Sequence, residues 1–363
     1  MAIRAATLVF LGFIAVGGPR LAVAQDRPSP PPATVVWQDT VATADIGGHD
    51  LQAVPDNQGG LYVVAGTISR RDSRGRILWT VRDMARGERR AMQVSADGDL
   101  WLAIVDGWQE VKTITALRFA SQDGRILHQH RWSVPLAADA SIVRFIPDDT
   151  GAMAAMSMTS GMWRLSLLKP GGDNELLPFA WPGTDSTPID LSPKADGRVI
   201  LLMSRRDSRL HWLYTISDGA QRMAGRNIPR LTECYPTVRL LANDSLAYMN
   251  CVGRLEQYDP ATERTVIVGV IHPDEGGGAA DLVYVTRDGA YVTKGIWIKR
   301  SQPPAEYGKN RKVLSADGQK SWVMTLKVGE TLIDSRTVLK IASTCEPRDV
   351  CPTLKMRLIS YAP

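Results

Sequence analysis

This sequence of 363 residues has few of the residue types on which most catalytic and metal sites depend, with 5 histidines and 4 cysteines in all. It lacks the Gly-x-Ser-x-Gly, His-Glu-x-x-His, phosphate-loop and Cys-x-x-Cys-His motifs. These absences argue against the serine hydrolases, zinc peptidases, nucleotide enzymes and cytochromes that carry them. We therefore predict no metal and no cofactor, and we assign no catalytic residue.

Long apolar runs and a strong net charge are also missing. Beyond the N-terminal region no stretch of about 18 apolar residues occurs, so we predict no transmembrane helix in the body of the chain. The 43 Lys+Arg and 38 Asp+Glu residues give a net charge of only +5. A nucleic-acid partner requires a clustered basic face, which this small excess does not indicate, so none is predicted.

Residues 1–24 have the organisation of a secretory signal peptide. Arg4 precedes the apolar segment Ala5–Gly17, and Ala22-Val23-Ala24 provides small residues where signal peptidase cleaves. The apolar segment is short for a membrane span, although a retained anchor is the alternative. We predict cleavage after Ala24, a proline-rich linker over residues 25–33, and a secreted or periplasmic protein.

The cysteines of an exported protein are expected to form disulfides. Three pairings of the four residues are possible, and we predict Cys234–Cys251 with Cys345–Cys351 because each pair closes a short local loop. Neither pair has the two-residue spacing of a redox or zinc motif, so a structural role is favoured over a redox role.

Residues 34–363 repeat one pattern, in which an apolar strand, a turn led by aspartate and a second apolar strand follow one another. Successive turns are separated by 41 to 52 residues. All-β units of this size that recur at nearly equal intervals are typical of a β-propeller. Seven units predict seven four-stranded blades in one domain, with six or eight as alternatives; the turn residues are Asp56, Asp97, Asp149, Asp196, Asp244, Asp288 and Asp334.

Most units contain a second hairpin turn, usually with glycine, which supplies the left-handed backbone that tight hairpins need. Shortly after this turn stands a large side chain that we expect to wedge between adjacent blades. These side chains are Trp79, His128, Leu176, Met223 and Trp322.

The two ends of the repeat region complement each other. The seventh unit ends after its third strand, at residues 354–361, and the segment Thr34–Asp39 has the pattern of an outer strand, with Trp37 at the wedge position. We therefore predict that the N-terminal strand completes the last blade, which also removes an open sheet edge.

The repeat resembles that of the quinoprotein-like propellers. The resemblance rests on Gly-Gly-Leu-Tyr-Val-Val at 59–64, on residues 72–79 ending in Trp79, and on the similar segments 95–101 and 123–127. It covers nearly all of residues 34–363 as architecture and implies a propeller. Quinone-dependent alcohol dehydrogenases of that superfamily carry adjacent bridged cysteines, which this sequence lacks, so the resemblance does not extend to their cofactor.

Binding groups of a propeller are expected on the longer, irregular loops opposite the tight turns. The loop at 271–280 combines His272, Asp274 and Glu275, which suits acid–base or metal chemistry, although its glycine run first indicates a mobile polar loop. Trp108 and Tyr307 add aromatic surface suited to protein or sugar contacts.

Two further patterns have both a functional and a structural interpretation. Arg205 and Arg206 belong to a Ser-Arg-Arg-Asp-Ser-Arg hexamer that also occurs at 69–74, which suits either an anion site or a solvated strand end, the second being favoured. His128 and His130 share one face of a strand and have metal-ligand spacing, but packing between blades is favoured because no third ligand is evident.

Two hypotheses of function remain. The favoured one is an exported, non-catalytic propeller that binds a protein or a small envelope ligand, or acts as a scaffold, through its irregular-loop face. The alternative is a quinoprotein-like oxidoreductase or a dehydrogenase-associated subunit with a site at the central channel. Because a propeller fold hosts enzymes and binding proteins alike, the two must be separated at the site.

Overall fold

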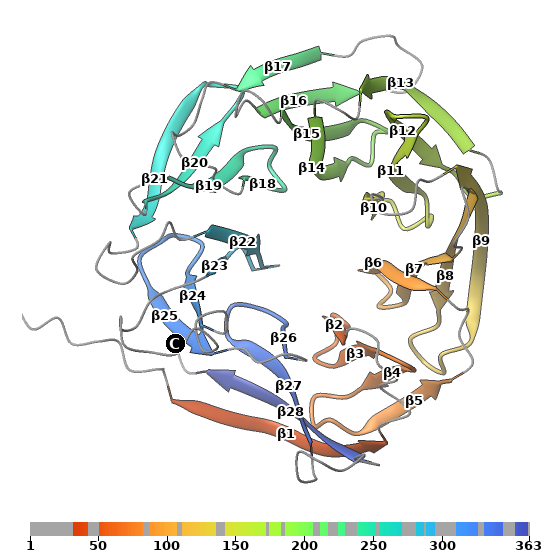
Figure 1. Ribbon diagram of the computed structural model, residues 1–363. Coiled ribbons are helices and arrows are strands. Elements are labelled where there is room, and N and C mark those ends of the chain that lie inside the picture. Colours follow the sequence, from red (N-terminus) through yellow and green to blue (C-terminus); the bar gives the residue numbers. More distant parts are fainter. Residues whose placement is uncertain are drawn as a thin grey trace, which may run out of the picture.

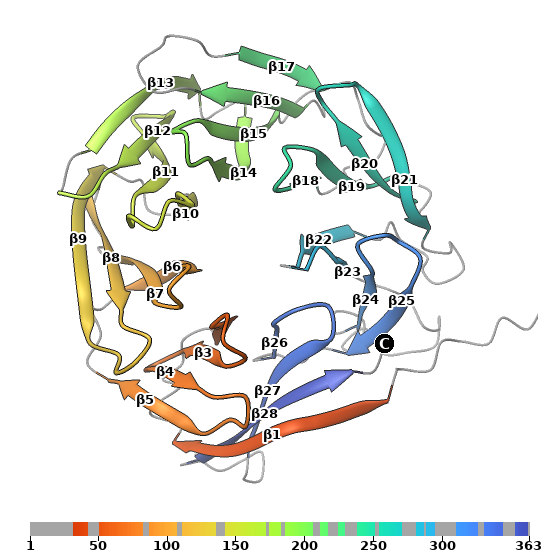
Figure 2. The same ribbon diagram turned by 180° about the vertical axis from the view of Figure 1, so that it is seen from behind.

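The structure is a computed structural model, and it describes the strand regions of the repeat. The described residues are 32–42, 51–82, 87–106, 111–135, 142–171, 174–182, 186–205, 211–216, 224–228, 238–250, 254–270, 281–286, 288–294, 310–325, 330–343 and 353–361. They form seven four-stranded antiparallel sheets, arranged as the blades of a ring in Figure 1 and, seen from behind, in Figure 2. The predicted seven-bladed propeller is therefore confirmed.

Each blade runs from an inner strand at the centre of the ring to an outer strand at its rim. Blade 1 contains β2 (Gln52–Pro55), β3 (Leu61–Val64), β4 (Ile68–Arg71) and β5 (Ile77–Val81). Blade 2 contains β6 (Glu88–Val94), β7 (Leu100–Asp106), β8 (Val111–Phe119) and β9 (Ile126–Pro135). Blade 3 contains β10 (Ile142–Phe145), β11 (Met153–Thr159), β12 (Met162–Leu168) and β13 (Asn174–Pro182).

The remaining blades follow the same order. Blade 4 contains β14 (Ser186–Pro193), β15 (Val199–Arg205), β16 (His211–Ile216) and β17 (Ala224–Ile228), and blade 5 contains β18 (Val238–Leu240), β19 (Leu246–Met249), β20 (Arg254–Asp259) and β21 (Arg264–Val270). Blade 6 contains β22 (Asp281–Val285), β23 (Tyr291–Lys294), β24 (Asn310–Leu314) and β25 (Ser321–Thr325). Blade 7 contains β26 (Thr331–Leu332), β27 (Thr337–Ser343), β28 (Thr353–Tyr361) and β1 (Ala33–Ala42).

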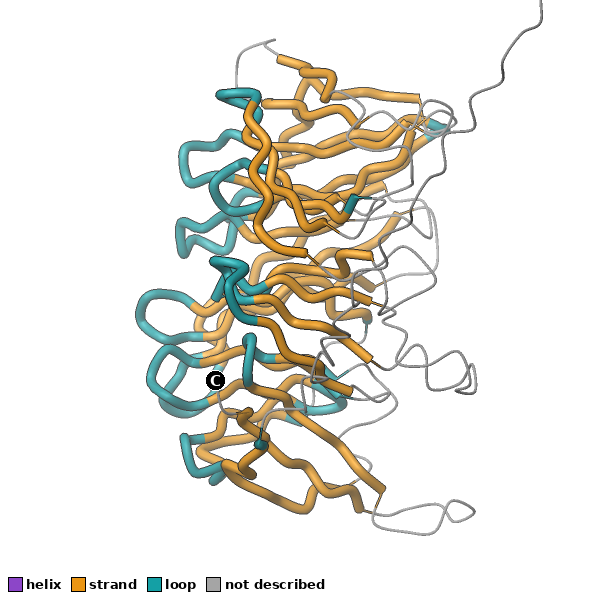
Figure 3. Tube along the Cα trace, turned by 90° about the vertical axis from the view of Figure 1, so that its left-hand side faces the viewer, coloured by secondary structure: helices purple, strands orange, loops and turns teal. Residues whose placement is uncertain are grey.

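Each predicted turn aspartate lies between the inner and second strands of its blade. In blade 1, Oδ1 of Asp56 accepts hydrogen bonds from the backbone N–H groups of Gln58, at 2.9 Å, and Gly60, at 2.7 Å. This side-chain acceptor replaces strand partners that the backbone loses in the turn, which is why aspartate initiates it. Figure 3 shows that the described tight turns gather on one side of the ring.

Blade 7 is closed by the N-terminal strand, as predicted. β1 pairs antiparallel with β28, in a register that runs from Ala33 opposite Tyr361 to Ala42 opposite Thr353. The first and last described strands therefore hold each other, and the sheet order β1-β28-β27-β26 leaves the ring without a gap at this point.

Two of the predicted wedge tryptophans each join neighbouring blades by packing and by one hydrogen bond. Nε1 of Trp79 donates to the carbonyl oxygen of Ser121 in blade 2 at 2.9 Å, and Nε1 of Trp322 donates to that of Ser335 in blade 7 at 3.1 Å. Both predicted wedges are confirmed. Burial of these rings supplies hydrophobic free energy at each joint, and the N–H bond fixes how deep the ring sits.

The wedge predictions for blades 2 and 3 were wrong. The side chain of Leu176 is 57% exposed, and the His128 ring is exposed as well. Other buried indoles join these blades to the next: Nε1 of Trp132 on β9 donates to the carbonyl oxygen of Lys169 in blade 3, and Nε1 of Trp163 on β12, the third strand, donates to that of Ser186 in blade 4, each at 2.9 Å. Blade 1 has the same bulge before Trp79 that blade 2 has before His128, so the spacing from the turn glycine does not by itself decide which side chain fills the joint.

Candidate functional site

The residues predicted to form a ligand site lie almost entirely outside the described part of the chain. Arg205 is the last residue of β15, where its backbone pairs with Ser186 of β14. The other predicted site residues and all four cysteines are outside the described residues: His272, Asp274, Glu275, Arg206, Trp108, Tyr307, Cys234, Cys251, Cys345 and Cys351. Their predicted roles remain predictions.

A cavity of about 490 Å³ lies among the inner strands of blades 3 to 6, within the described residues. These strands face the centre of the ring in Figure 1. The volume is within the range of small-molecule sites in proteins, about 300–1,000 Å³. The lining residues are Arg144, Ile189, Asp190, Leu191, Ser192, Arg239, Leu240, Leu241, Ala242 and Val285.

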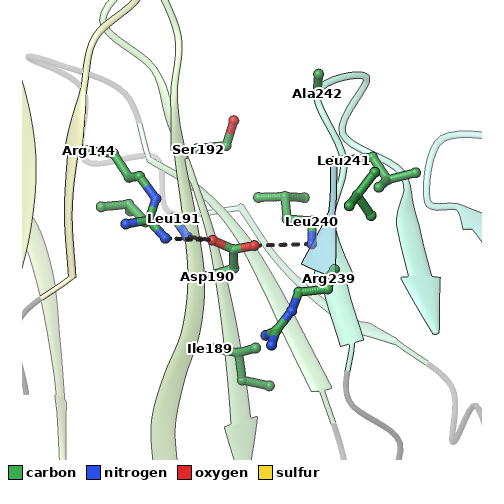
Figure 4. Close-up of a pocket in the computed structure, with 10 residues that line it drawn as sticks. Arg144, Ile189, Asp190, Leu191, Ser192, Arg239, Leu240, Leu241 and Ala242 are labelled. Carbon is green, nitrogen blue, oxygen red and sulfur yellow. Dashed lines mark hydrogen bonds and ion pairs between the residues drawn. The ribbon is translucent and has the colours of Figure 1, made fainter. Parts of the chain in front are cut away.

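Asp190 reaches this cavity because β14 contains a bulge. The pairing of β14 with β15 places Pro188 opposite Met203 and Asp190 opposite Leu202, so Ile189 has no partner of its own. A bulge of this kind redirects the side chains beside it. Oδ1 of Asp190 accepts a hydrogen bond from the N–H of Leu191 at 2.9 Å, and Oδ2 accepts one from the N–H of Leu240 in blade 5 at 3.4 Å. Asp190 therefore ties blade 4 to blade 5 (Figure 4).

Arg144 approaches the same carboxylate from blade 3. Its Nη2 lies 3.7 Å from Oδ1 of Asp190, and its Nη1 donates to the carbonyl oxygen of Val143 at 3.0 Å. The side chain is 46% exposed. A guanidinium has five N–H groups, so most of those on Arg144 have no protein acceptor within the described residues.

Arg239 of β18 also lines the cavity, on the other side of Asp190 from Arg144, and its guanidinium ends near Ile189 in Figure 4. The charged lining residues are two guanidinium groups and one carboxylate; Arg239 is already engaged in another interaction, so the N–H groups open to a ligand are those of Arg144. A low-dielectric wall of protein on several sides strengthens the field of such a charge compared with open solvent. The cavity is therefore suited to an anion.

A second cavity of about 380 Å³ lies at the tight turns of blades 1, 6 and 7 and is lined in part by Asp288 and Asp334. Both carboxylates are already engaged. Asp288 accepts hydrogen bonds from the backbone N–H of Ser335 and the hydroxyl of Thr286, and Asp334 accepts two from the backbone of its own turn. These bonds explain the carboxylates as turn supports.

His128 and His130 form a stacked aromatic group with buried Trp101. The ring centroids of the two histidines lie 6.4 Å apart, and each stacks on Trp101, at 6.3 Å and 5.9 Å. Burial lowers the pKa of His130, and the neighbouring His128 lowers it further. The His128 ring is exposed and Trp101 belongs to the same blade, so the predicted packing of His128 between blades is wrong, and the pair instead stacks on an indole of its own blade.

Arg144, Asp190 and Arg239 were not among the predicted site residues. The sequence does contain a signal for them, because each is a charged residue between two apolar ones in an inner strand: Val143-Arg144-Phe145, Ile189-Asp190-Leu191 and Val238-Arg239-Leu240. Three consecutive repeat units share this feature. A charge in a strand that surrounds the axis is expected to face the channel or to be paired, and all three residues line the cavity while Arg144 and Asp190 lie 3.7 Å apart.

No protein-family model matches the sequence, and no curated protein matches it. A membrane-spanning helix is not found in the part of the chain that the structure describes. The fold is similar to that of several solved propellers.

An oligogalacturonate lyase in complex with manganese is 11% identical, has a TM-score of 0.53, and covers 92% of this chain and 98% of its own. Oligogalacturonate lyase from Vibrio parahaemolyticus is 12% identical, with a TM-score of 0.52 and coverage of 91% and 98%. The Swd1 propeller domain from Myceliophteria thermophila is 11% identical, with a TM-score of 0.51 and coverage of 88% and 98%. At these identities the similarity shows the propeller fold alone, and it does not single out the quinoprotein-like superfamily.

Proposed function

We propose that this chain is a non-catalytic binding protein that holds a small anionic ligand in the channel cavity of blades 3 to 6. One observation carries the proposal: Arg144 and Arg239 line a cavity of about 490 Å³ together with a single carboxylate, Asp190. Arg144 presents N–H groups that no described residue accepts. A guanidinium of this kind binds carboxylates through two parallel hydrogen bonds.

The charged groups of the site come from three blades rather than from one loop. Its charged groups stand on β10, β14 and β18, and Asp190 is fixed by two backbone N–H groups. Groups held on strands are placed more accurately than groups on loops, so less conformational entropy is lost when a ligand binds.

The proposal is tested by calorimetric titration of the purified protein with citrate, inorganic phosphate and an oligogalacturonate. The last probe is included because two structures of similar fold are named oligogalacturonate lyases. We expect at least one carboxylate probe to bind, and Arg144→Ala to weaken it by about tenfold or more, since a hydrogen bond to a charged group contributes about 1.5–3 kcal/mol.

The matched control is Arg125→Ala, which removes an arginine that is 73% exposed at the second hairpin turn of blade 2, far from the cavity lining. It should leave the affinity unchanged, because an exposed charge acts weakly through salt solution. Binding that Arg144→Ala does not weaken, or no binding by any probe, would contradict the proposal.

Export and partner binding extend this proposal. A cleaved signal at residues 1–24 would place the protein in the periplasm or outside the cell, where it meets small envelope ligands. Recognition of a partner protein through the irregular loops stays a prediction, as does the oxidoreductase alternative, which has the repeat resemblance as its support.

A further inference from the structure

Asp190 is an unexpected neighbour for an anion. Its carboxylate faces the cavity beside Arg144, and its side chain is 19% exposed there. An anionic ligand bound to Arg144 therefore lies close to a second negative charge, and like charges at short range repel each other strongly in a partly enclosed site. An anion without a hydrogen-bond donor would be attracted by Arg144 and repelled by Asp190.

The carboxylate of Asp190 still has acceptor capacity. It accepts two backbone hydrogen bonds, of which the one from Leu240 is long at 3.4 Å, out of about four acceptor sites on an ionised carboxylate. The nearest guanidinium nitrogen of Arg144, at 3.7 Å, is beyond hydrogen-bond distance. Among the described residues, Asp190 thus keeps free lone pairs next to the guanidinium.

Ser192 adds a second polar group on the same strand. It lines the cavity two residues after Asp190, and side chains at this spacing lie on the same face of a strand. Its hydroxyl both donates and accepts, so it can bind the same kind of ligand group as Asp190.

From this arrangement we infer that the ligand carries a hydrogen-bond donor next to its carboxylate, as in a 2-hydroxy or 2-amino acid. The carboxylate binds Arg144, and the donor, a hydroxyl or an ammonium group, binds Asp190. The donor converts a repulsive contact into a hydrogen bond, so Asp190 selects against anions that lack one. This inference rests on the proposed function and concerns the same cavity.

The cavity volume of about 490 Å³ is larger than a three-carbon acid needs. The acid and its donor therefore form the head group of the ligand. The rest of the ligand extends past Ile189, Leu240 and Val285, whose side chains are half-buried and apolar. Apolar contacts of this kind contribute affinity without choosing among head groups.

Four small probes test the inference by saturation-transfer NMR titration of the wild-type protein: propanoate, lactate, alanine and inorganic phosphate. Lactate and alanine differ from propanoate only by the donor on the second carbon. We expect at least one of them to bind about tenfold tighter than propanoate, because a hydrogen bond to a charged acceptor separates them. Which of the two binds tighter distinguishes a hydroxyl from an ammonium ligand. Phosphate, which has hydroxyl donors of its own but no carboxylate, tests whether the carboxylate is required, and binding as tight as that of lactate or alanine would overturn that part of the inference.

Two variants locate the effect. Asp190→Asn should reduce the preference for the donor-bearing probe to about threefold or less, since it removes the charge while keeping one acceptor for Leu191. Arg144→Ala should weaken all three carboxylates together. The comparison of probes on the wild-type protein needs no variant, so it holds even where Asp190→Asn folds poorly.

Failure of the inference and failure of the proposed function give different results. Equal binding of propanoate, lactate and alanine, all weakened by Arg144→Ala, would overturn the inference and keep the anion site. Retention of the full preference in folded Asp190→Asn would also overturn the inference. No binding of any carboxylate, or binding that Arg144→Ala leaves intact, would overturn both.

Discussion

A Cβ added to Gly75 would lie 2.5 Å from the indole ring of Trp37, so the ring packs directly on the glycine backbone. Gly75 is in the second hairpin turn of blade 1, and Trp37 is on β1, the strand that closes blade 7. The same contact recurs at Gly124, which lies 2.5 Å from the ring of Trp79 by the same measure. Each glycine is therefore required for two reasons: the turn needs a left-handed backbone, and the tryptophan of the preceding blade leaves no room for a Cβ.

Gly75→Ala should destabilise the propeller by more than the backbone strain of the turn alone. The backbone φ of Gly75 is +81°, which adds strain of about 1–2 kcal/mol for a residue with Cβ. Displacing Trp37 adds about 1–3 kcal/mol of overpacking. The free energy of unfolding in urea measures the sum.

Gly59→Ala is the matched control, because its φ is +85° and no atom lies within 4 Å of its Cβ position. It should lose only the backbone contribution. Equal losses for the two variants would show that Trp37 does not press on the turn.

Much of this architecture follows from the sequence because it depends on local chemistry. The turn aspartates, the seven units, the closing strand and the wedges Trp79 and Trp322 need only short-range patterns. The channel site depends instead on a bulge that shifts β14 at Pro188–Asp190 and on side chains from three blades. The charged residues between apolar ones in the inner strands are a local pattern, but neither the bulge nor the meeting of Arg144 with Asp190 can be read from it, so the site was not predicted.

Asp56→Ala tests the buried ion pair inside the joint of blades 1 and 2. Oδ2 of Asp56 accepts from Nε and Nη2 of Arg70, at 2.9 Å and 2.7 Å, and the two side chains are only 1% and 9% exposed. Removing one partner leaves a buried unpaired charge, so we expect a loss of about 3–5 kcal/mol in the free energy of unfolding. Arg70→Met in the same chain should recover part of it.

The turn of blade 4 provides the comparison. Asp196 pairs with Arg198 at 2.6 Å, but these side chains are 53% and 49% exposed. Asp196→Ala should therefore leave the free energy of unfolding nearly unchanged, since exposed ion pairs contribute little. Equal losses in the free energy of unfolding for the two aspartate variants would contradict the idea that burial strengthens the effect of the blade 1 ion pair.

The His128–His130 pair predicts a dependence of stability on pH. Burial and the nearby His128 lower the pKa of His130 below its usual 6.5, so the folded state favours the neutral ring. The unfolded chain binds this proton first. The stability that the neutral His130 ring gives the folded state is complete above pH 6.5, and it is lost as the pH falls from 6.5 toward the lower pKa of the folded state.

His130→Gln should flatten this part of the curve, as seen in melting temperatures at pH 7, 6 and 5. His128→Gln should flatten it partly, because it removes one of the two causes of the shift. The lowered pKa values of Asp288 and Asp317 act in a different range, below their usual 3.8, so they do not obscure the comparison. An unchanged slope in His130→Gln would contradict the assignment.

The mass of the protein recovered from the exported fraction tests the predictions that lie outside the described residues. Cleavage after Ala24 gives a chain that starts at Gln25, and two disulfides remove four hydrogens from its mass. Cys234→Ser should leave Cys251 as a reactive thiol if those two are bridged, while Cys345 and Cys351 stay protected. A chain of full mass would contradict the signal peptide, and four reactive thiols would contradict the disulfides.

The native mass spectrum of the same sample also compares the two proposed functions. A small carboxylate that is lost on denaturation supports the channel site, whereas a quinone-sized cofactor supports the oxidoreductase.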